Sequence, residues 1–85
     1  MTRHDLKISP LYYDAVASGV KTFEVRRDDR PFRVGDLLVL HEWAEGKATR
    51  RPMLRRTVAY ILRHDDFPDG IPEGFAVLGI KGADA

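Results

Sequence analysis

Three charged side chains gather early in the sequence, on a stretch that otherwise reads as a strand. Lys21, Glu24 and Arg26 all fall within the short segment "GVKTFEVR". Arginine offers a planar fork of N–H donors that grips a phosphate or stacks on a base, and lysine offers a point charge. A glutamate between them can accept hydrogen bonds from the amino edge of a base, or hold the two cations in position. These residue types are therefore candidates for binding a nucleotide.

The spacing of these residues restricts how they can meet. The segment alternates with a period of two, which puts Glu24 and Arg26 on one side and the apolar Phe23 on the other. Lys21 is three positions from Glu24, so in a regular strand the two would point to opposite faces. Both reach one cleft only if Lys21 lies in the turn after Gly19 or if the strand begins with a bulge.

The same charges allow a plainer interpretation. Lys21, Glu24 and Arg26 also fit an ion-pair network on a solvated strand face, which is a common use of clustered charges. Arg27 and Arg30 follow closely and are predicted to be rim charges, as apt to meet solvent as to meet a ligand. Two hypotheses thus stay open for this stretch, a ligand site and a solvated network.

Capping residues and periodicity predict the elements that position these side chains. A short strand is expected over residues 4–8. A helix is expected over 9–19, with Ser9 as its cap, Pro10 in its first turn and Gly19 as the left-handed residue past its end. The chain should therefore enter the charged segment directly from the end of a helix.

Further strands are expected after the helix, over residues 21–27, 37–43, 53–63 and 74–80. Residues 37–43 are apolar almost throughout, which is typical of a strand covered on both faces. Residues 53–63 also fit helical spacing, but their β-branched and aromatic side chains favour a strand. Residues 28–36 and 44–52 read as loops, and Asp36 is expected to cap the backbone of its turn.

This order predicts one α+β domain over residues 1–85, mainly β, with about five strands and one helix after the first strand. The sheet is short and two of its runs are apolar on both faces, so we expect it to curl into a small β-barrel with the helix at one side. The helix should pack on it through a face that carries Tyr12, Ala15 and Val16.

The overall composition excludes several classes of protein. The net charge is only +1, which argues against binding nucleic acid by bulk electrostatic attraction. The sequence has no cysteine, so disulfides, zinc–thiolate sites and thiol catalysis are ruled out. Because no apolar run could span a membrane and the charged start lacks a signal-peptide pattern, we expect a cytoplasmic protein without membrane contact. No cofactor is predicted, and a monomer is assumed by default.

Other residues that could do chemistry give weak signals. Histidines stand beside carboxylates in three places, namely His4 with Asp5, His41 with Glu42, and His64 with Asp65 and Asp66. Their spacing matches no compact ligand set, so no metal site is predicted, and His41 is expected to be hydrogen-bonded in the core or at a cleft edge. Tyr12, Tyr13, Phe32 and Trp43 could stack on bases, but Trp43 is expected to belong to the core.

The charged segment also resembles a known family. "GVKTFEVR" is similar to the G-x-K-x-x-E-x-R signature of ASCH domains, which belong to the PUA-like β-barrel superfamily. Residues 4–43 resemble the opening of small stand-alone bacterial and phage ASCH-type proteins, and "RRTVAYIL" and "GFAVLGI" fit their closing strands. The resemblance implies a PUA-like fold with a cleft between helix and barrel that holds Lys21, Glu24 and Arg26 and receives RNA or a nucleotide.

An enzyme is the alternative that this resemblance implies. Some ASCH-type proteins are amidohydrolases of N4-acetylcytidine that use a lysine, a threonine and a glutamate. Lys21 matches the lysine, but Glu24 stands where the threonine is expected, which leaves Thr22 as a substitute hydroxyl. The family's glutamate lies in a helical insertion that is short here, with Glu73 as a possible replacement. The leading expectation is therefore an RNA- or nucleotide-binding module, with amidohydrolysis and a nucleotide-free protein-interaction role as rivals.

Overall fold

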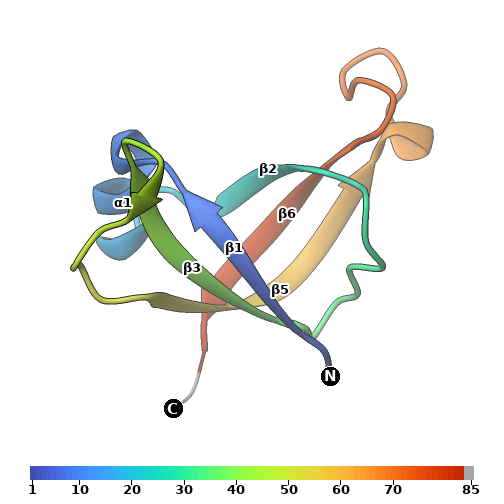
Figure 1. Cartoon of the computed structure of the whole chain (residues 1–85). Helices are drawn as coiled ribbons and strands as arrows, with labels where there is room; N and C mark the ends of the chain where they lie inside the picture. The colour runs from blue at the N-terminus through green and yellow to red at the C-terminus, as the bar shows by residue number, and fades with distance from the viewer. Residues whose placement is uncertain (84–85) are drawn as a thin grey trace.

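A strand, a short helix and a second strand come first along the chain. In the computed structural model, which describes residues 1–83, these are β1 (Arg3–Ile8), α1 (Pro10–Ala17) and β2 (Phe23–Arg27) (Figure 1). The remaining elements are β3 (Leu37–Ala44), β4 (Lys47–Ala48), β5 (Leu54–Arg63), a 3₁₀ turn (His64–Asp66) and β6 (Phe75–Gly82). Within the described residues no helix is long and apolar enough to cross a membrane.

The helix begins and ends as its sequence predicts. The Ser9 hydroxyl accepts a hydrogen bond from the Leu11 N–H at 3.2 Å, and Pro10 takes the first helical position. Gly19 follows the C-cap with a φ of +83° and turns the chain out of the helix. The Lys21 N–H then donates to the Ala15 carbonyl at 2.9 Å, so the segment before β2 is tied back to α1.

The strands form one mixed, mainly antiparallel sheet in the order β1-β3-β5-β6-β2, with β4 added to the end of β3. β1 runs parallel to β3, whereas β3, β5, β6 and β2 follow one another in antiparallel pairs. A bulge between Val58 and Tyr60 interrupts β5 beside Gly79 of β6, and such bulges bend and twist a sheet. The prediction of a mainly β α+β domain with the helix after the first strand is confirmed.

The predicted β-barrel is wrong, because the sheet stays open between β1 and β2. Among the described residues β1 pairs only with β3, and β2 pairs only with β6. Closure would need a backbone ladder between these two edge strands. Instead β1 turns at once into Ser9 and α1, and β2 has only five residues, of which Arg26 reaches across the gap to the Lys7 carbonyl of β1. We call this opening between β1 and β2 the seam.

The core is one cluster of buried side chains, to which α1 contributes Tyr13 and Val16. It is built from buried side chains of β1, α1, β3, β5, β6 and the loop before β3: Leu6, Ile8, Tyr13, Val16, Phe32, Leu38, Leu40, Val58, Ala76, Leu78 and Ile80. Residues Leu37 to Leu40 of β3 are all buried, which confirms that this strand is covered on both faces. Apolar burial on this scale is the main force that holds the fold together.

Two local predictions fail for identifiable reasons. The helix buries Val16 as predicted, but the tyrosine that it buries is Tyr13 and not Tyr12, whose side chain is 46% exposed. The predicted loop 44–52 contains β4, because Glu45 and Gly46 both have positive φ and form a two-residue hairpin turn between Ala44 and Lys47. Glycine at the second position favours such a turn, but glutamate at the first position hides it from sequence inspection.

Candidate functional site

Lys21, Glu24 and Arg26 converge on one carboxylate at the seam. Lys21 Nζ lies 2.9 Å from Glu24 Oε1, and Arg26 donates to Glu24 Oε2 from Nε at 3.1 Å and from Nη2 at 2.9 Å. The strand begins only at Phe23, so Lys21 lies in the turn after Gly19. Of the two geometries that the spacing allows, the structure has the first.

The strand that carries Glu24 has its polar and apolar faces inverted. Glu24 is 4% exposed and lies in register with the buried Leu78 of β6, whereas Phe23 and Val25 are 45% and 54% exposed. Burying a carboxylate costs several kcal/mol unless cations and hydrogen bonds offset it. Lys21 and Arg26 supply that offset here. A strand that buries its charge and exposes its apolar residues is typical of a binding surface rather than of a core.

Arg26 also bridges the seam. Its Nη2 donates to the carbonyl of Lys7 on β1, in addition to the bonds that it makes with Glu24 on its own strand. A side chain therefore joins the two edge strands where a closed barrel would have a backbone ladder. This arrangement leaves open space along the seam on both sides of Arg26.

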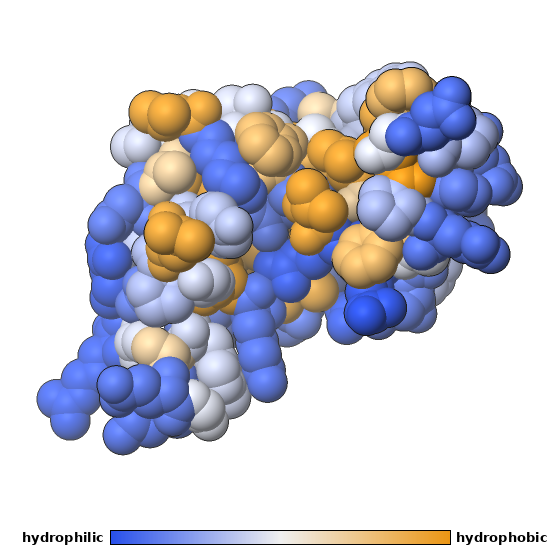
Figure 2. All heavy atoms as spheres, turned by 90° about the horizontal axis from the view of Figure 1, so that it is seen from above, coloured by the Kyte–Doolittle hydropathy of each residue, from blue (hydrophilic) through white to orange (hydrophobic). Residues whose placement is uncertain are grey.

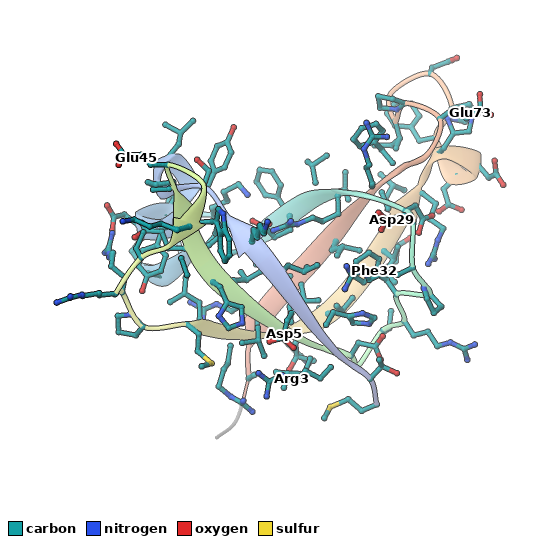
Figure 3. The ribbon with its side chains drawn as sticks, in the orientation of Figure 1. Arg3, Asp5, Asp29, Phe32, Glu45 and Glu73 are labelled. Atoms are coloured by element: carbon teal, nitrogen blue, oxygen red, sulfur yellow. The ribbon has the colours of Figure 1, made fainter. Side chains whose placement is uncertain are left out.

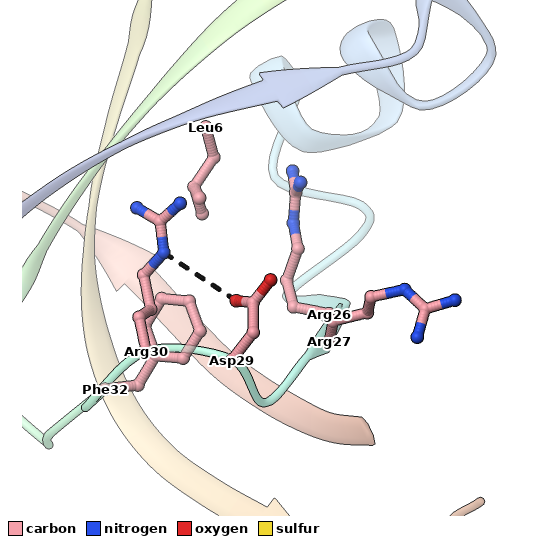
Figure 4. Close-up of a pocket in the computed structure, with 6 residues that line it drawn as sticks. All are labelled: Leu6, Arg26, Arg27, Asp29, Arg30 and Phe32. Atoms are coloured by element: carbon pink, nitrogen blue, oxygen red, sulfur yellow. Dashed lines mark ion pairs between the residues drawn. The ribbon is translucent and has the colours of Figure 1, made fainter. Parts of the chain in front are cut away.

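That space consists of three adjoining hollows, which together we call the seam groove. The first, of about 310 Å³, is lined by Tyr12, Lys21, Phe23, Glu24 and Val25. The second, of about 190 Å³, is lined by Lys7, Ile8, Ser9, Tyr12, Glu24, Val25 and Arg26. The third, of about 220 Å³, is lined by Leu6, Arg26, Arg27, Asp29, Arg30 and Phe32 (Figure 4). Neighbouring hollows share Glu24 or Arg26, so the groove follows β2 along its length.

Aromatic rings flank the first hollow. The Lys21 ammonium lies 4.8 Å from the ring centroids of both Tyr12 and Phe23, which is a cation–π distance. Both rings are about half exposed and offer faces on which a base could stack. Figure 2, which looks onto the molecule from above Figure 1, shows exposed apolar residues in orange among hydrophilic ones in blue. The first hollow thus combines an apolar platform with a fixed cation.

Positive charge is concentrated along the groove. Its lining includes five cationic side chains, Lys7, Lys21, Arg26, Arg27 and Arg30, against the two carboxylates of Glu24 and Asp29. The whole chain has a formal charge of only +1, so the excess at the groove exceeds that of the molecule. A local field of this kind attracts an anion even when the total charge is small.

The predicted rim arginines meet the groove in different ways. Arg30 lines the third hollow, with its Nε 3.9 Å from the Asp29 carboxylate, which is too long for a hydrogen bond. Arg27 also lines this hollow and extends outward from it (Figure 4). Its guanidinium lies 5.1 Å from the ring centroid of Phe75. Sequence reasoning placed both as rim charges but missed Asp29 and Phe23. The signal available for Phe23 was its position between Lys21 and Glu24.

Of the residues of the hydrolase hypothesis, Lys21 and Glu24 are in contact, whereas Glu73 lies elsewhere. Thr22 precedes β2 and its side chain is exposed. Glu73 lines a separate hollow of about 370 Å³ with Asp28, Arg63, His64, Asp65, Gly74 and Phe75, at the opposite end of the molecule from α1 (Figure 3). The structure therefore brings Glu24, but not Glu73, to the Lys21 ammonium.

Asp36 has the capping role that its position predicts. Its carboxylate accepts hydrogen bonds from the Thr2 and Arg33 N–H groups at 3.0 and 2.9 Å, and from the buried His4 Nε2 at 2.8 Å. Burial acts to raise the pKa of the Asp36 carboxyl, but these three hydrogen bonds outweigh it, so that the pKa lies below its ordinary value. Asp36 and His4 thus form a structural pair that anchors the N-terminus.

The other histidines also have structural partners. His41 Nε2 lies 2.9 Å from Asp5, and the hydrogen bonds from Arg3 and then His41 lower the pKa of the Asp5 carboxyl to about 2 (Figure 3). His64 Nδ1 lies 2.6 Å from the Ile71 carbonyl. In the described part of the chain no three His, Asp or Glu side chains are placed to hold a metal ion. Trp43 is half-buried beneath the Lys7 ammonium, which lies 4.2 Å from its ring centroid.

Comparison with known proteins places this chain in a family. The chain is 42% identical over 53 residues to a protein of Escherichia phage P2 named "Uncharacterized 12.9 kDa protein in GpA 3'region". That alignment covers 62% of this chain and 49% of the phage protein, so the chain matches about half of that relative's length. Residues 3–80, which include every helix and strand but the last residues of β6, match the family described as "Domain of unknown function (DUF3850)". This protein therefore belongs to the DUF3850 family.

Proposed function

We propose that this domain is an ASCH-type, PUA-like module that binds RNA or a modified nucleotide in the seam groove. The observation that carries the proposal is the convergence of Lys21, Glu24 and Arg26, the three charged positions of the G-x-K-x-x-E-x-R motif, at one concave site. A solvated ion-pair network does not need a buried carboxylate, yet Glu24 is buried. A buried, fully paired charge at the mouth of a groove is better explained as a device that fixes two cations for a ligand.

The groove has the features that single-stranded nucleic acids use. Tyr12 and Phe23 offer half-exposed ring faces beside Lys21, and stacking on such rings contributes about 1–3 kcal/mol per base. Cations continue from Lys21 past Arg26 to Arg30, where a phosphate backbone could follow them. The open seam, rather than a closed barrel wall, supplies the space.

A titration of short single-stranded RNA of mixed sequence, followed by fluorescence anisotropy at two salt concentrations, tests this proposal. We expect saturable binding that weakens with salt and that Arg26→Ala reduces by about tenfold or more, since a hydrogen bond to a charged group contributes about 1.5–3 kcal/mol. Arg50→Ala is the matched control, because it removes the same charge from an exposed position outside the groove lining. Equal losses in the two variants, or no binding by the parent protein, would reject the proposal.

The same protein preparation can be used to test whether the protein is an enzyme rather than a binding module. Incubation with N4-acetylcytidine should leave the nucleoside unchanged if the groove only binds, because Lys21 Nζ is already engaged by the Glu24 carboxylate and the Phe23 carbonyl. Release of cytidine that depends on Lys21 would replace the binding proposal with amidohydrolysis.

A further inference from the structure

We infer that the seam groove takes a phosphorylated nucleotide in one orientation, with its phosphate in the third hollow between Arg26 and Arg30 and its base on Tyr12 and Phe23. The inference rests on the proposed function, since it names the ligand class and the orientation for that same groove. It follows from the hydrogen-bond donors that Lys21 and Arg26 have to spare and from the position of the Asp29 carboxylate.

Glu24 holds the cations of the groove in position and has little capacity left to bind a base. Three hydrogen bonds from Lys21 and Arg26 occupy its two oxygens, and almost none of the side chain is exposed. A carboxylate has about four acceptor positions, so little capacity remains for the amino edge of a base. The sequence-based idea that Glu24 reads such an edge is therefore not favoured by this geometry.

The groups left for a ligand are donors. Lys21 Nζ has three N–H bonds and uses two of them on Glu24 and on the Phe23 carbonyl. Arg26 uses Nε and Nη2 on Glu24 and on the Lys7 carbonyl, which leaves both N–H bonds of Nη1. A groove with spare donors and a nearly saturated acceptor suits a ligand rich in acceptors, and phosphate oxygens bind arginine most strongly.

The third hollow already contains an anion between its arginines. Figure 4 shows the Asp29 carboxylate between the side chains of Arg26 and Arg30. Its 3.9 Å separation from Arg30 makes this a loose pair, and the Asp29 side chain is 65% exposed. A carboxylate held so weakly is displaced easily by a dianionic phosphate, which would form the short bidentate contacts that Asp29 does not make. Asp29 thus competes with the ligand for the same cations.

This competition predicts opposite effects of two exposed variants. Arg30→Ala should weaken binding of uridine 5′-monophosphate by about tenfold, because it removes a charge-assisted contact. Asp29→Asn should strengthen that binding severalfold, because it removes the competing anion while keeping the side-chain shape. Neither change should alter binding of uridine, which lacks the phosphate. Phe23→Ala should weaken both ligands, because it removes a stacking surface.

Isothermal titration calorimetry of the full chain with uridine, uridine 5′-monophosphate and inorganic phosphate tests the inference, with Arg50→Ala as the charge control. Tighter binding of the monophosphate, lost in Arg30→Ala and enhanced in Asp29→Asn, would support it. Equal affinities for uridine and its monophosphate would overturn the phosphate assignment while leaving the proposed nucleotide groove intact. Equal affinities for inorganic phosphate and the monophosphate, with binding of the monophosphate unaffected by Phe23→Ala, would overturn the placement of the base. No binding of any nucleoside, nucleotide or RNA would overturn the proposed function itself.

Discussion

Removal of the Glu24 carboxylate is expected to destabilise the fold as well as the groove. Glu24→Ala leaves two cations without their shared partner, and breaking a buried ion pair in this way costs about 3–5 kcal/mol. Lys21 and Arg26 keep 15% and 21% of their side-chain surface exposed and can turn partly toward water, so we expect the lower end, about 3 kcal/mol. Glu24→Gln keeps the shape and one acceptor, and we expect about half that loss.

A loss of about 3 kcal/mol is a large part of the stability expected for a chain of 85 residues, which is about 4–13 kcal/mol. It corresponds to a decrease in melting temperature of roughly 12–24 °C. Urea unfolding followed by the fluorescence of Trp43 and by circular dichroism measures the loss, with the exposed Glu73→Gln as control. If Glu24→Ala unfolds within about 0.5 kcal/mol of the parent, the carboxylate is not a buried partner of two cations, and the reasoning fails.

A triple replacement separates stability from function. Lys21→Met, Glu24→Leu and Arg26→Met together remove all three charges, and apolar residues in place of a buried ionic network are often neutral or stabilising. We expect the triple variant to recover most of the stability that Glu24→Ala loses but to bind no nucleotide. Recovery of binding along with stability would mean that the charges only support the fold.

Three further predictions concern the frame and the rim of the groove. The pKa of the Asp36 carboxyl lies below its usual value of 3.8 in the folded state. The contribution of this carboxylate to stability is therefore present above pH 4 and is lost as the pH falls through the folded pKa. In acid unfolding, the stability of Asp36→Asn should accordingly vary less with pH below 4 than that of the parent. Gly19→Ala should cost about 1–2 kcal/mol in urea unfolding, because Gly19 has a φ of +83° and no atom blocks an added Cβ, so that only backbone strain contributes. Phe23→Ala should weaken RNA binding by about tenfold while changing the free energy of unfolding by less than about 1 kcal/mol, because the ring is already half exposed.

Local signals in the sequence were enough for the helix and the longer strands of this fold, but not for β4 or for the closure of the sheet. The cap at Ser9 and the left-handed Gly19 delimit α1, and the β-branched run 53–63 is the strand β5. A barrel and an open curled sheet have the same alternation within each strand, and only the pairing of distant edges distinguishes them. Alternation predicts that Glu24 and Arg26 lie on the same side of β2, which is correct. It cannot tell which side of the strand is buried, so the burial of Glu24 could not be predicted.

The same limit applies to the candidate site. The types and spacing of Lys21, Glu24 and Arg26 indicated a shared site, and the structure brings these three together. The free donors of Arg26 depend on its reach from β2 to the Lys7 carbonyl of β1, and the role of Asp29 depends on its place beside Leu6 and Arg26 in the third hollow, which no local pattern encodes. Tyr12 joins the groove because α1 buries its neighbour Tyr13 instead, a choice set by packing against the sheet.

An NMR titration of the ¹⁵N-labelled full chain with a short single-stranded RNA tests most directly whether the seam is the binding site. We predict saturable changes in amide chemical shift that are largest at Tyr12, along β2 and at Asp29 and Arg30, and that Arg26→Ala abolishes. Changes confined to β4 and the loop around Arg50, or no changes at all at RNA concentrations that saturate binding in solution, would contradict a nucleotide site between β1 and β2.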